Sequence, residues 1–209
     1  MPTVEREFGV PFPGREVPRE RWTKTGWRDD AKTFDWARVF GRAAPRVVDL
    51  GCGNGRYLIS SACRRHDRDH LGVDLVQRCI DFAAHRANRR GLANVRFATG
   101  DARTWLFERL DAADEIHVYH PQPKGDRLVT PEFLERVLAV LRPDGLLVLQ
   151  TDNLAYWREL THIARARFDV EVVPGPWPDA PRGRTRREIV ARSRGWSIWR
   201  MLARRRRAP

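Results

Sequence analysis

Three aspartates each follow a short apolar run in the first half of the chain. Asp49 and Asp74 end two such runs, and Asp101 comes after a third run and a glycine. If the runs are neighbouring strands of a parallel sheet, their carboxyl ends meet at one edge and the three carboxylates face one crevice. The alternative is that each aspartate only caps the helix that follows its strand.

A glycine-rich segment begins directly after Asp49. Gly51, Gly53 and Gly55 alternate with other residues, so the backbone can turn sharply and lie close to a ligand. The dinucleotide-binding pattern spaces its glycines G-x-G-x-x-G and docks a pyrophosphate on a helix N-terminus. Here the third glycine comes one residue early and an acid stands beside the turn. This favours a ligand with an ammonium or sulfonium group over a phosphate.

These features predict S-adenosylmethionine as the cofactor and a methyltransferase as the class of enzyme. Gly51 and Gly53 are expected at the cofactor, with Asp49 near the methionine ammonium. Asp74 follows at about the spacing of an acid that binds ribose hydroxyls. Asp101 is expected to accept from the adenine amino group.

A second set of candidates follows the expected fourth and fifth strands. His120 and Lys124 belong to a His-Pro-Gln-Pro-Lys segment, in which two prolines fix a rigid loop over the same crevice. His120 either contacts substrate or is a surface histidine. Lys124 either holds a phosphate or base edge or is solvated. Asp152 either orients a base, by accepting from its amino and imino groups, or caps the next helix.

The composition is that of a soluble domain with a basic end. The 209 residues are 42% hydrophobic and 32% charged, and no apolar run approaches the roughly 18 residues that span a bilayer. The net charge is +12, and the segment from Pro174 onward holds eleven arginines against Asp179 and Glu188. This density favours nucleic acid as the partner. The alternative is a solvated arginine-rich tail.

Other sequence features indicate the cellular compartment, whether a metal is bound, and which aromatic side chain could stack on a base. The first residues carry no signal-peptide pattern, and the three cysteines form no C-x-x-C pair, which indicates a reduced, cytoplasmic chain without a membrane partner. Cys63, His66 and His70 follow a C-x2-H-x3-H spacing, but no second pair lies at zinc-finger spacing, so no metal is expected. Trp177 either stacks on a base or packs in the core.

Strand and helix patterns alternate from residue 33 onward. This predicts an α/β fold with a Rossmann-like, doubly wound, mostly parallel seven-stranded sheet of the class I methyltransferase type. The expected strands are 46–50, 70–74, 95–98, 114–119, 146–150, 168–173 and 196–202, and the expected helices are 33–40, 56–65, 76–90, 102–109, 131–141, 154–167 and 185–191. The predicted organisation is an extended, flexible N-terminal arm (1–32), the methyltransferase domain (33–203) and a basic tail (204–209) that contacts phosphates.

In these residues the chain resembles the bacterial tRNA (guanine-N7-)-methyltransferase family, from about residue 34 to residue 202. The most specific likeness is RLVTPEFL at 127–134, followed by LRPDG at 141–145 and TDN at 151–153. The turn that begins at Asp49 matches the family's cofactor turn, and Asp74 matches the family's ribose-binding acid. The family usually has Glu at the positions of Asp49 and Asp74. Asp101 lies where Asn is common. Thr185 and Glu188 match a Thr-x-x-Glu element that the family uses on its substrate.

The resemblance implies transfer of a methyl group from S-adenosylmethionine to N7 of a guanine in the variable loop of tRNA. It implies substrate contacts from four residues, which are Lys124, Asp152, Thr185 and Glu188. The family's loop after the fourth strand reads SDPWPK, whereas residues 119–124 read YHPQPK, so His120 replaces the aspartate usually treated as catalytic.

We therefore expect His120 and Asp152 to be the catalytic residues, with His120 also beside the cofactor. Two alternatives stay open. One is a methyltransferase with a small-molecule or protein substrate, and the other is a tRNA-binding homologue without turnover. The sequence does not determine the oligomeric state, and a monomer is the working expectation.

Overall fold

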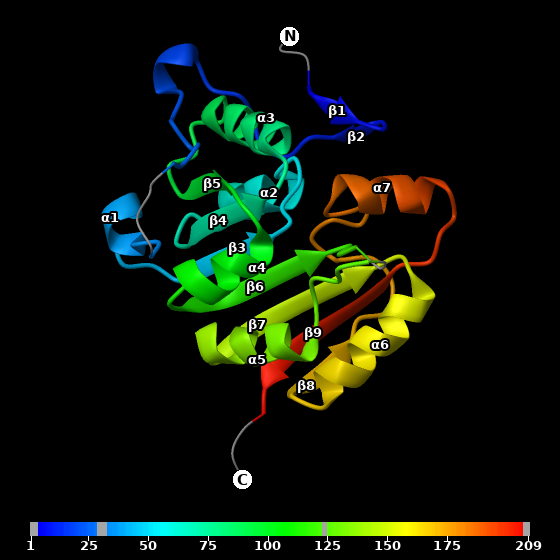
Figure 1. Cartoon of the computed structure of the whole chain (residues 1–209). Coiled ribbons are helices and arrows are strands. Elements are labelled where there is room, and N and C mark those ends of the chain that lie inside the picture. The colour runs from blue at the N-terminus through cyan, green and yellow to red at the C-terminus, as the bar shows by residue number, and fades with distance from the viewer. Residues whose placement is uncertain (1–3, 29–32, 123–124, 207–209) are drawn as a thin grey trace.

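The structure is a computed structural model that describes residues 4–28, 33–122 and 125–206. Its main sheet has seven strands in the order β5-β4-β3-β6-β7-β9-β8. They are β3 (Arg46–Leu50), β4 (Asp69–Asp74), β5 (Val95–Thr99), β6 (Ala113–Tyr119), β7 (Leu141–Thr151), β8 (Phe168–Val172) and β9 (Trp199–Arg205). Figure 1 shows this sheet with helices on both faces.

The strand order confirms the expected doubly wound, mostly parallel sheet. The strands from β5 to β7 pair in parallel, and β9 runs antiparallel to both of its neighbours. The chain builds outward from β3 to β5 and then returns to β6 on the other side of β3. Such a reversal opens a crevice at the carboxyl ends of the two central strands.

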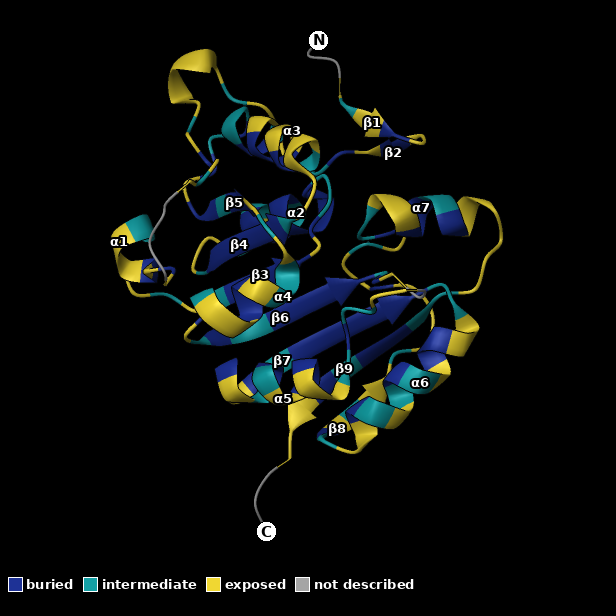
Figure 2. Ribbon diagram, in the orientation of Figure 1, coloured by how far each residue is buried: buried dark blue, intermediate teal, exposed yellow. Residues whose placement is uncertain are grey.

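Helices flank the sheet, and the four longest of them bury an apolar side against it. The helices are α1 (Trp36–Phe40), α2 (Arg56–Arg64), α3 (Gln77–Asn88), α4 (Ala102–Thr104), the π-helical turn η2 (Trp105–Arg109), α5 (Pro131–Val140), α6 (Leu154–Arg165) and α7 (Arg186–Ser193). One core cluster joins α2 and α3 to one face of the sheet, and another joins α1, η2, α5 and α6 to the opposite face. Figure 2 shows the buried strands between helices whose outer sides are exposed.

The last strand differs from the expected 196–202. Trp196 donates its backbone N–H to Ala191 O at 2.9 Å, which closes a turn after α7 and delays β9 to Trp199. Pairing with β8 then carries the strand to Arg205, opposite Phe168. Two arginines expected in a free tail therefore belong to the sheet. The strand expected at 146–150 also differs, because β7 begins at Leu141 and has a register shift against β6.

The described part of the N-terminal segment lies against the domain. It holds the hairpin strands β1 (Arg6–Glu7) and β2 (Val10–Pro11) and the 3-10 turn η1 (Arg19–Arg21). Gly26 forms a parallel bridge with Phe97 on β5. The buried Thr25 hydroxyl bonds Asn88 Oδ1 at 2.8 Å. In the described part of the chain, no helix has the length and apolarity needed to cross a membrane.

Candidate active site

A cavity of about 540 Å³ opens at the carboxyl ends of β3 and β6. The glycine turn after β3 forms one wall, the end of β6 another, and α7 with the residue before it a third. Among the residues that line it are Asp49, Gly51, Gly53, His120 and Thr185, all of them predicted site residues. The structure therefore brings these five predicted residues together at one cavity.

The glycine turn takes a backbone shape that other residues rarely adopt. Gly51 and Gly53 have φ of +84° and +53°, and a Cβ added to either would meet no atom within 4 Å. Glycine is therefore needed at these two positions for its backbone conformation, and the space beside each residue is open to a ligand. Gly55 differs, because its Cβ would lie 2.8 Å from the Cβ of Ala83 on α3.

Asp49 has a buried carboxyl group without a full set of partners. Its exposed fraction is 2%, and Oδ1 makes no hydrogen bond within the described residues. Burial raises the pKa of this carboxyl well above its usual range, and the nearby charge of Asp74 raises it further. An unpaired buried oxygen that lines a cavity is suited to receive a cationic group from a ligand. The donor set thus fits the ammonium end of S-adenosylmethionine.

Asp74 and Asp101 are not among the residues that line the cavity. Asp74 holds the glycine turn, because its Oδ2 accepts from Gly53 N at 2.8 Å and its Oδ1 accepts from Val76 N at 2.9 Å. Each oxygen keeps a further lone pair. Asp101 caps α4 by accepting from Thr104 N at 2.9 Å and is exposed. For Asp101, the helix cap considered in the sequence is therefore present.

His120 lies at the end of β6 in a strained backbone conformation. Its φ is +52°, which is uncommon for a residue with a side chain. The backbone N–H donates to Gln150 O at 2.7 Å, and the side chain is 3% exposed. Its Nε2 lies 2.7 Å from Gln150 Nε2, and its Nδ1 lies 3.4 Å from Asp152 Oδ1. The structure thus brings His120 and Asp152 together.

Asp152 is held as a carboxylate. The approach of His120, aided by Arg187, lowers the pKa of the Asp152 carboxyl to about 2 despite partial burial. Arg187 donates through Nε to Oδ2 at 3.0 Å and through Nη2 to Oδ1 at 3.3 Å. The Arg187 side chain is 60% exposed, so this fork sits on the solvent side of the pair.

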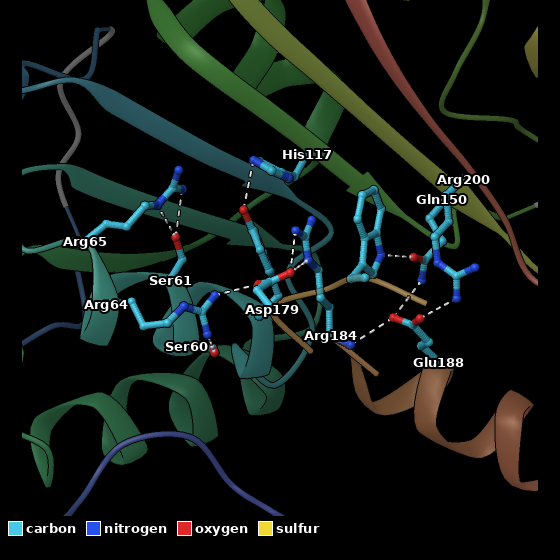
Figure 3. Close-up of polar contacts among 12 residues, drawn as sticks. Ser60, Ser61, Arg64, Arg65, His117, Gln150, Asp179, Arg184, Glu188 and Arg200 are labelled. Carbon is cyan, nitrogen blue, oxygen red and sulfur yellow. Dashed lines mark hydrogen bonds and ion pairs between the residues drawn. The ribbon is translucent and has the colours of Figure 1, made fainter. Parts of the chain in front are cut away.

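Gln150 on β7 is the centre of a buried polar cluster (Figure 3). Its Oε1 accepts from Trp177 Nε1 at 2.5 Å, and its Nε2 also donates to Glu188 Oε2 at 3.3 Å. Glu188 is fully buried and accepts from Arg200 at 2.5 Å and from Arg184 N at 2.8 Å. Trp177 is therefore a core residue, and the Glu188 carboxylate faces the protein interior, away from the cavity.

The loop before α7 is fixed to the body of the domain. Arg184 donates to Tyr119 Oη at 3.0 Å and to Asp179 at 2.7 Å, and Asp179 also accepts from Arg64 of α2 at 2.6 Å. Figure 3 shows this chain of contacts between α2 and the loop. Thr185 then caps α7 by accepting from Glu188 N at 3.1 Å. These contacts set the position of α7 beside the cavity.

Further lining residues were not found from the sequence. Arg186 and Arg194 of the α7 segment line the cavity and are exposed. Phe8, at the tip of the β1–β2 hairpin, also lines it, with φ of +46° and 55% exposure. The guanidinium carbon of Arg186 lies 5.2 Å from the centre of the Phe8 ring. No local pattern marks Phe8, because it stands in a charged segment without periodicity.

The hairpin is attached to the glycine turn through Glu7. This buried carboxylate accepts from Asn54 Nδ2 at 2.6 Å and pairs with Arg56 at 3.2 Å. The remaining predicted site residue, Lys124, lies outside the described residues. Across residues 4–28, 33–122 and 125–206, no group of three or more His, Cys, Asp or Glu side chains is arranged to hold a metal ion.

Comparison with known proteins gives the same class of enzyme. A family model described as a putative methyltransferase matches residues 43–201. The chain is 31% identical to a tRNA (guanine-N(7)-)-methyltransferase of Halorhodospira halophila, over 92% of this chain and 81% of that protein. It is 32% identical to the Alkalilimnicola ehrlichii protein of the same name, over 72% and 67%.

A solved structure supports the fold alone. The 16S rRNA methyltransferase KamB matches with a TM-score of 0.65 at 18% identity, over 88% of this chain and 99% of that one. The sequence likeness, which spans most of the chain, carries the assignment. The chain belongs to the tRNA (guanine-N7-)-methyltransferase family.

Proposed function

We propose that this protein transfers a methyl group from S-adenosylmethionine to N7 of a guanine in tRNA. The observation that carries the proposal is the cavity shared by the open glycine turn, His120 and the Asp49 carboxyl, whose Oδ1 has no hydrogen-bond partner within the described residues. The names of the relatives support tRNA as the substrate. The variable-loop guanosine is the target that the family resemblance implies.

Four groups of the chain are proposed to hold the cofactor. Asp49 would bind the ammonium, and the open sides of Gly51 and Gly53 would let the cofactor lie against the backbone. Asp74 would accept from ribose hydroxyls through its spare lone pairs. Asp101 is exposed and would reach the adenine amino group through the carboxylate oxygen that does not cap α4.

The chemistry asks little of the protein beyond orientation. When bound, the cofactor supplies a methyl group on a sulfonium, whose C–S bond breaks as the N7 lone pair forms the new C–N bond. Because N7 carries no proton, no general base is needed, and positioning supplies much of the acceleration. The methylated ring becomes cationic, so the Asp152 carboxylate beside His120 would stabilise the developing charge.

The remaining substrate contacts follow from the position of α7. Exposed Arg186 and Arg194 would contact RNA phosphates beside the cavity, and Thr185 would contact substrate at its wall. Lys124 would hold a phosphate from the loop after β6. Glu188 would act indirectly, by holding the backbone of Arg184 and so the start of α7.

The proposal extends to assembly and compartment. The three cysteines are free thiols in the structure, which fits a reducing cytoplasm. We propose a monomer in which residues 33–203 form the catalytic domain and the N-terminal segment packs on it. Light scattering during size-exclusion chromatography tests the assembly directly.

An assay with isotope-labelled S-adenosylmethionine and bulk tRNA tests the function. We expect label in 7-methylguanosine after digestion of the wild-type product, and none with Asp49→Asn. Calorimetry with S-adenosylhomocysteine separates the alternatives. Cofactor binding without transfer to tRNA would indicate another substrate or a binding protein without turnover. No binding and no transfer would overturn the proposal.

A further inference from the structure

The buried cluster around Gln150 determines which nitrogen of His120 carries the proton. Trp177 Nε1 can only donate, so Gln150 must present its amide oxygen to the indole and its amide nitrogen to the other side. The Glu188 carboxylate, which only accepts, selects the same orientation. The amide of Gln150 therefore faces His120 with a donor.

It follows that Nε2 of His120 accepts. That nitrogen lies 2.7 Å from Gln150 Nε2, so a proton on it would point at the amide hydrogens. A neutral imidazole with an accepting Nε2 carries its hydrogen on Nδ1. His120 Nδ1 is buried and has no aligned hydrogen-bond partner within the described residues. His120 thus carries an N–H donor that approaches Asp152 Oδ1 at 3.4 Å without a well-aligned hydrogen bond.

The donor stands beside an acceptor. Asp152 Oδ1 lies 3.4 Å from His120 Nδ1, and its carboxylate retains lone pairs beyond those that Arg187 uses. Guanine presents the complementary pair on neighbouring ring positions, because its 6-oxo group accepts and its N1–H donates. Adenine presents the reverse, an amino donor beside an N1 lone pair. A guanine held this way keeps N7 free.

We propose that His120 and Asp152 together read the 6-oxo and N1–H groups of the target guanine, and that Gln150 is the positioning residue that keeps His120 a donor. The inference rests on the proposed function but goes beyond it, because it assigns base selection to a histidine and a buried amide. It predicts that the enzyme discriminates at position 6 of the purine as well as requiring N7.

Imidazole nitrogen shifts test the donor assignment directly. In ¹⁵N-histidine-labelled full-length protein, the signals of His120 are identified by their loss in His120→Asn. We expect a protonated Nδ1 and an unprotonated Nε2 at neutral pH. A proton on Nε2 overturns the inference, whatever the activity of the enzyme.

Substrate analogues test the base reading. The guanosine that the wild-type enzyme methylates is located first and then replaced in the tRNA by 2-aminopurine riboside. This base keeps N7 and the 2-amino group but lacks the 6-oxo group and N1–H. A well-placed pair of hydrogen bonds discriminates by about tenfold to a hundredfold, so we expect kcat/KM to fall by that factor.

Gln150→Met is the informative variant, because methionine fills a similar volume but has no amide group to determine which nitrogen of His120 carries the proton. We expect the preference for guanosine over 2-aminopurine riboside to fall to a few-fold at most. Thr151→Val is the matched control, a buried neighbour on the same strand whose hydroxyl bonds Asn153 N at 3.2 Å and not His120. It should keep the wild-type preference.

The outcomes separate the two proposals. A wild-type enzyme that does not methylate tRNA overturns the proposed function and the base reading with it. An active wild type with no preference for guanosine overturns the base reading alone. Equal preference in wild type and Gln150→Met overturns the role of Gln150, as does an equal loss in Thr151→Val. Should Gln150→Met not fold, the wild-type imidazole shifts decide.

Discussion

The buried carboxyl group of Asp49 destabilises the ligand-free protein at neutral and higher pH. Burial raises its pKa, so ionising it in the folded protein costs more than in the unfolded chain. The neutral Asp49 carboxyl contributes to the free energy of unfolding below the pKa that this group has in the unfolded chain. This contribution is lost as pH rises through the higher pKa of the group in the folded protein. The same carboxylate is proposed to bind the cofactor ammonium, so binding and stability make opposite demands on this residue.

Asp49→Asn should therefore separate stability from binding. We expect the variant to be more stable than the wild type at pH 8, by roughly 2–4 °C in Tm, with a smaller difference at pH 5. We also expect it to give no heat with S-adenosylhomocysteine. Calorimetry and thermal unfolding at both pH values measure this. Asp67→Asn, at a side chain that is 74% exposed, serves as the control, and a less stable Asp49→Asn protein at pH 8 would contradict the argument.

Phe8 combines backbone strain, exposure and a place at the cavity. A glycine adopts φ of +46° without the steric penalty that phenylalanine carries. Phe8→Gly should therefore leave the urea midpoint unchanged or raise it. It should lower methyl transfer to tRNA, because a lining aromatic side chain is removed. Phe82→Ala is the control, since Phe82 is 50% exposed with Arg78 over its ring but does not line the cavity.

At the scale of elements, the position of the loop before α7 depends on the indole ring of Trp177. Trp177 is 3% exposed and donates to Gln150 Oε1, and Arg184 stacks on its ring at 3.8 Å. Trp177→Phe keeps an aromatic ring but removes the N–H donor, which leaves the buried amide oxygen of Gln150 without this partner. We expect a loss of about 1–3 kcal/mol of unfolding free energy in urea. Trp196→Phe, at a 48% exposed site, should change little.

The elements that apolar periodicity and capping residues define were predictable. Strand β3 was predicted to the residue, and Thr130 with Pro131 marked the start of α5, where Thr130 Oγ1 accepts from Phe133 N. The last strand was misplaced because its register is set by β8, which is distant in sequence. The hairpin of β1 and β2 was missed because two-residue strands leave no periodic signal.

The site was predictable only where its residues follow parallel strands. Asp49 is the penultimate residue of β3 and His120 directly follows β6, so the sheet topology alone brings them to one crevice. The contribution of α7 depends on long-range contacts, such as Arg184 with Tyr119, that no local pattern encodes. Gln150 ends the apolar run 146–149 and is followed by other polar residues, so the sequence alone did not single it out. Its role required knowledge of Trp177 and Glu188.

At the scale of the whole molecule, two groups among the arginines of the C-terminal segment lie in different places. Arg186 and Arg194 line the cavity. Arg204 and Arg205 lie toward the opposite end of β9, whose first residue, Trp199, pairs with Thr151 at the carboxyl end of β7. Arg205 donates to the carbonyls of Leu138 and Leu141. Figure 1 shows β9 ending on the side of the molecule away from α7.

The two groups should differ in the salt dependence of tRNA binding. Each phosphate contact contributes about 0.9 to the slope of log affinity against log salt on duplex regions. Replacing Arg186 and Arg194 by glutamine should flatten the slope by about 1–2 in filter-binding titrations. The same change at Arg204 and Arg205 should have little effect. An equal or larger effect at the second pair would assign the tRNA contact to the end of β9.

The attachment of Glu7 to Asn54 has a consequence for the dynamics of the N-terminal segment. The buried carboxylate of Glu7 joins the hairpin to the glycine turn. A compound that binds and orders the turn should therefore also order the hairpin. Amide hydrogen exchange should then slow at Phe12, whose N–H is bonded to Glu5 O at 2.7 Å. Protection there would report occupancy from a residue that the ligand itself does not touch.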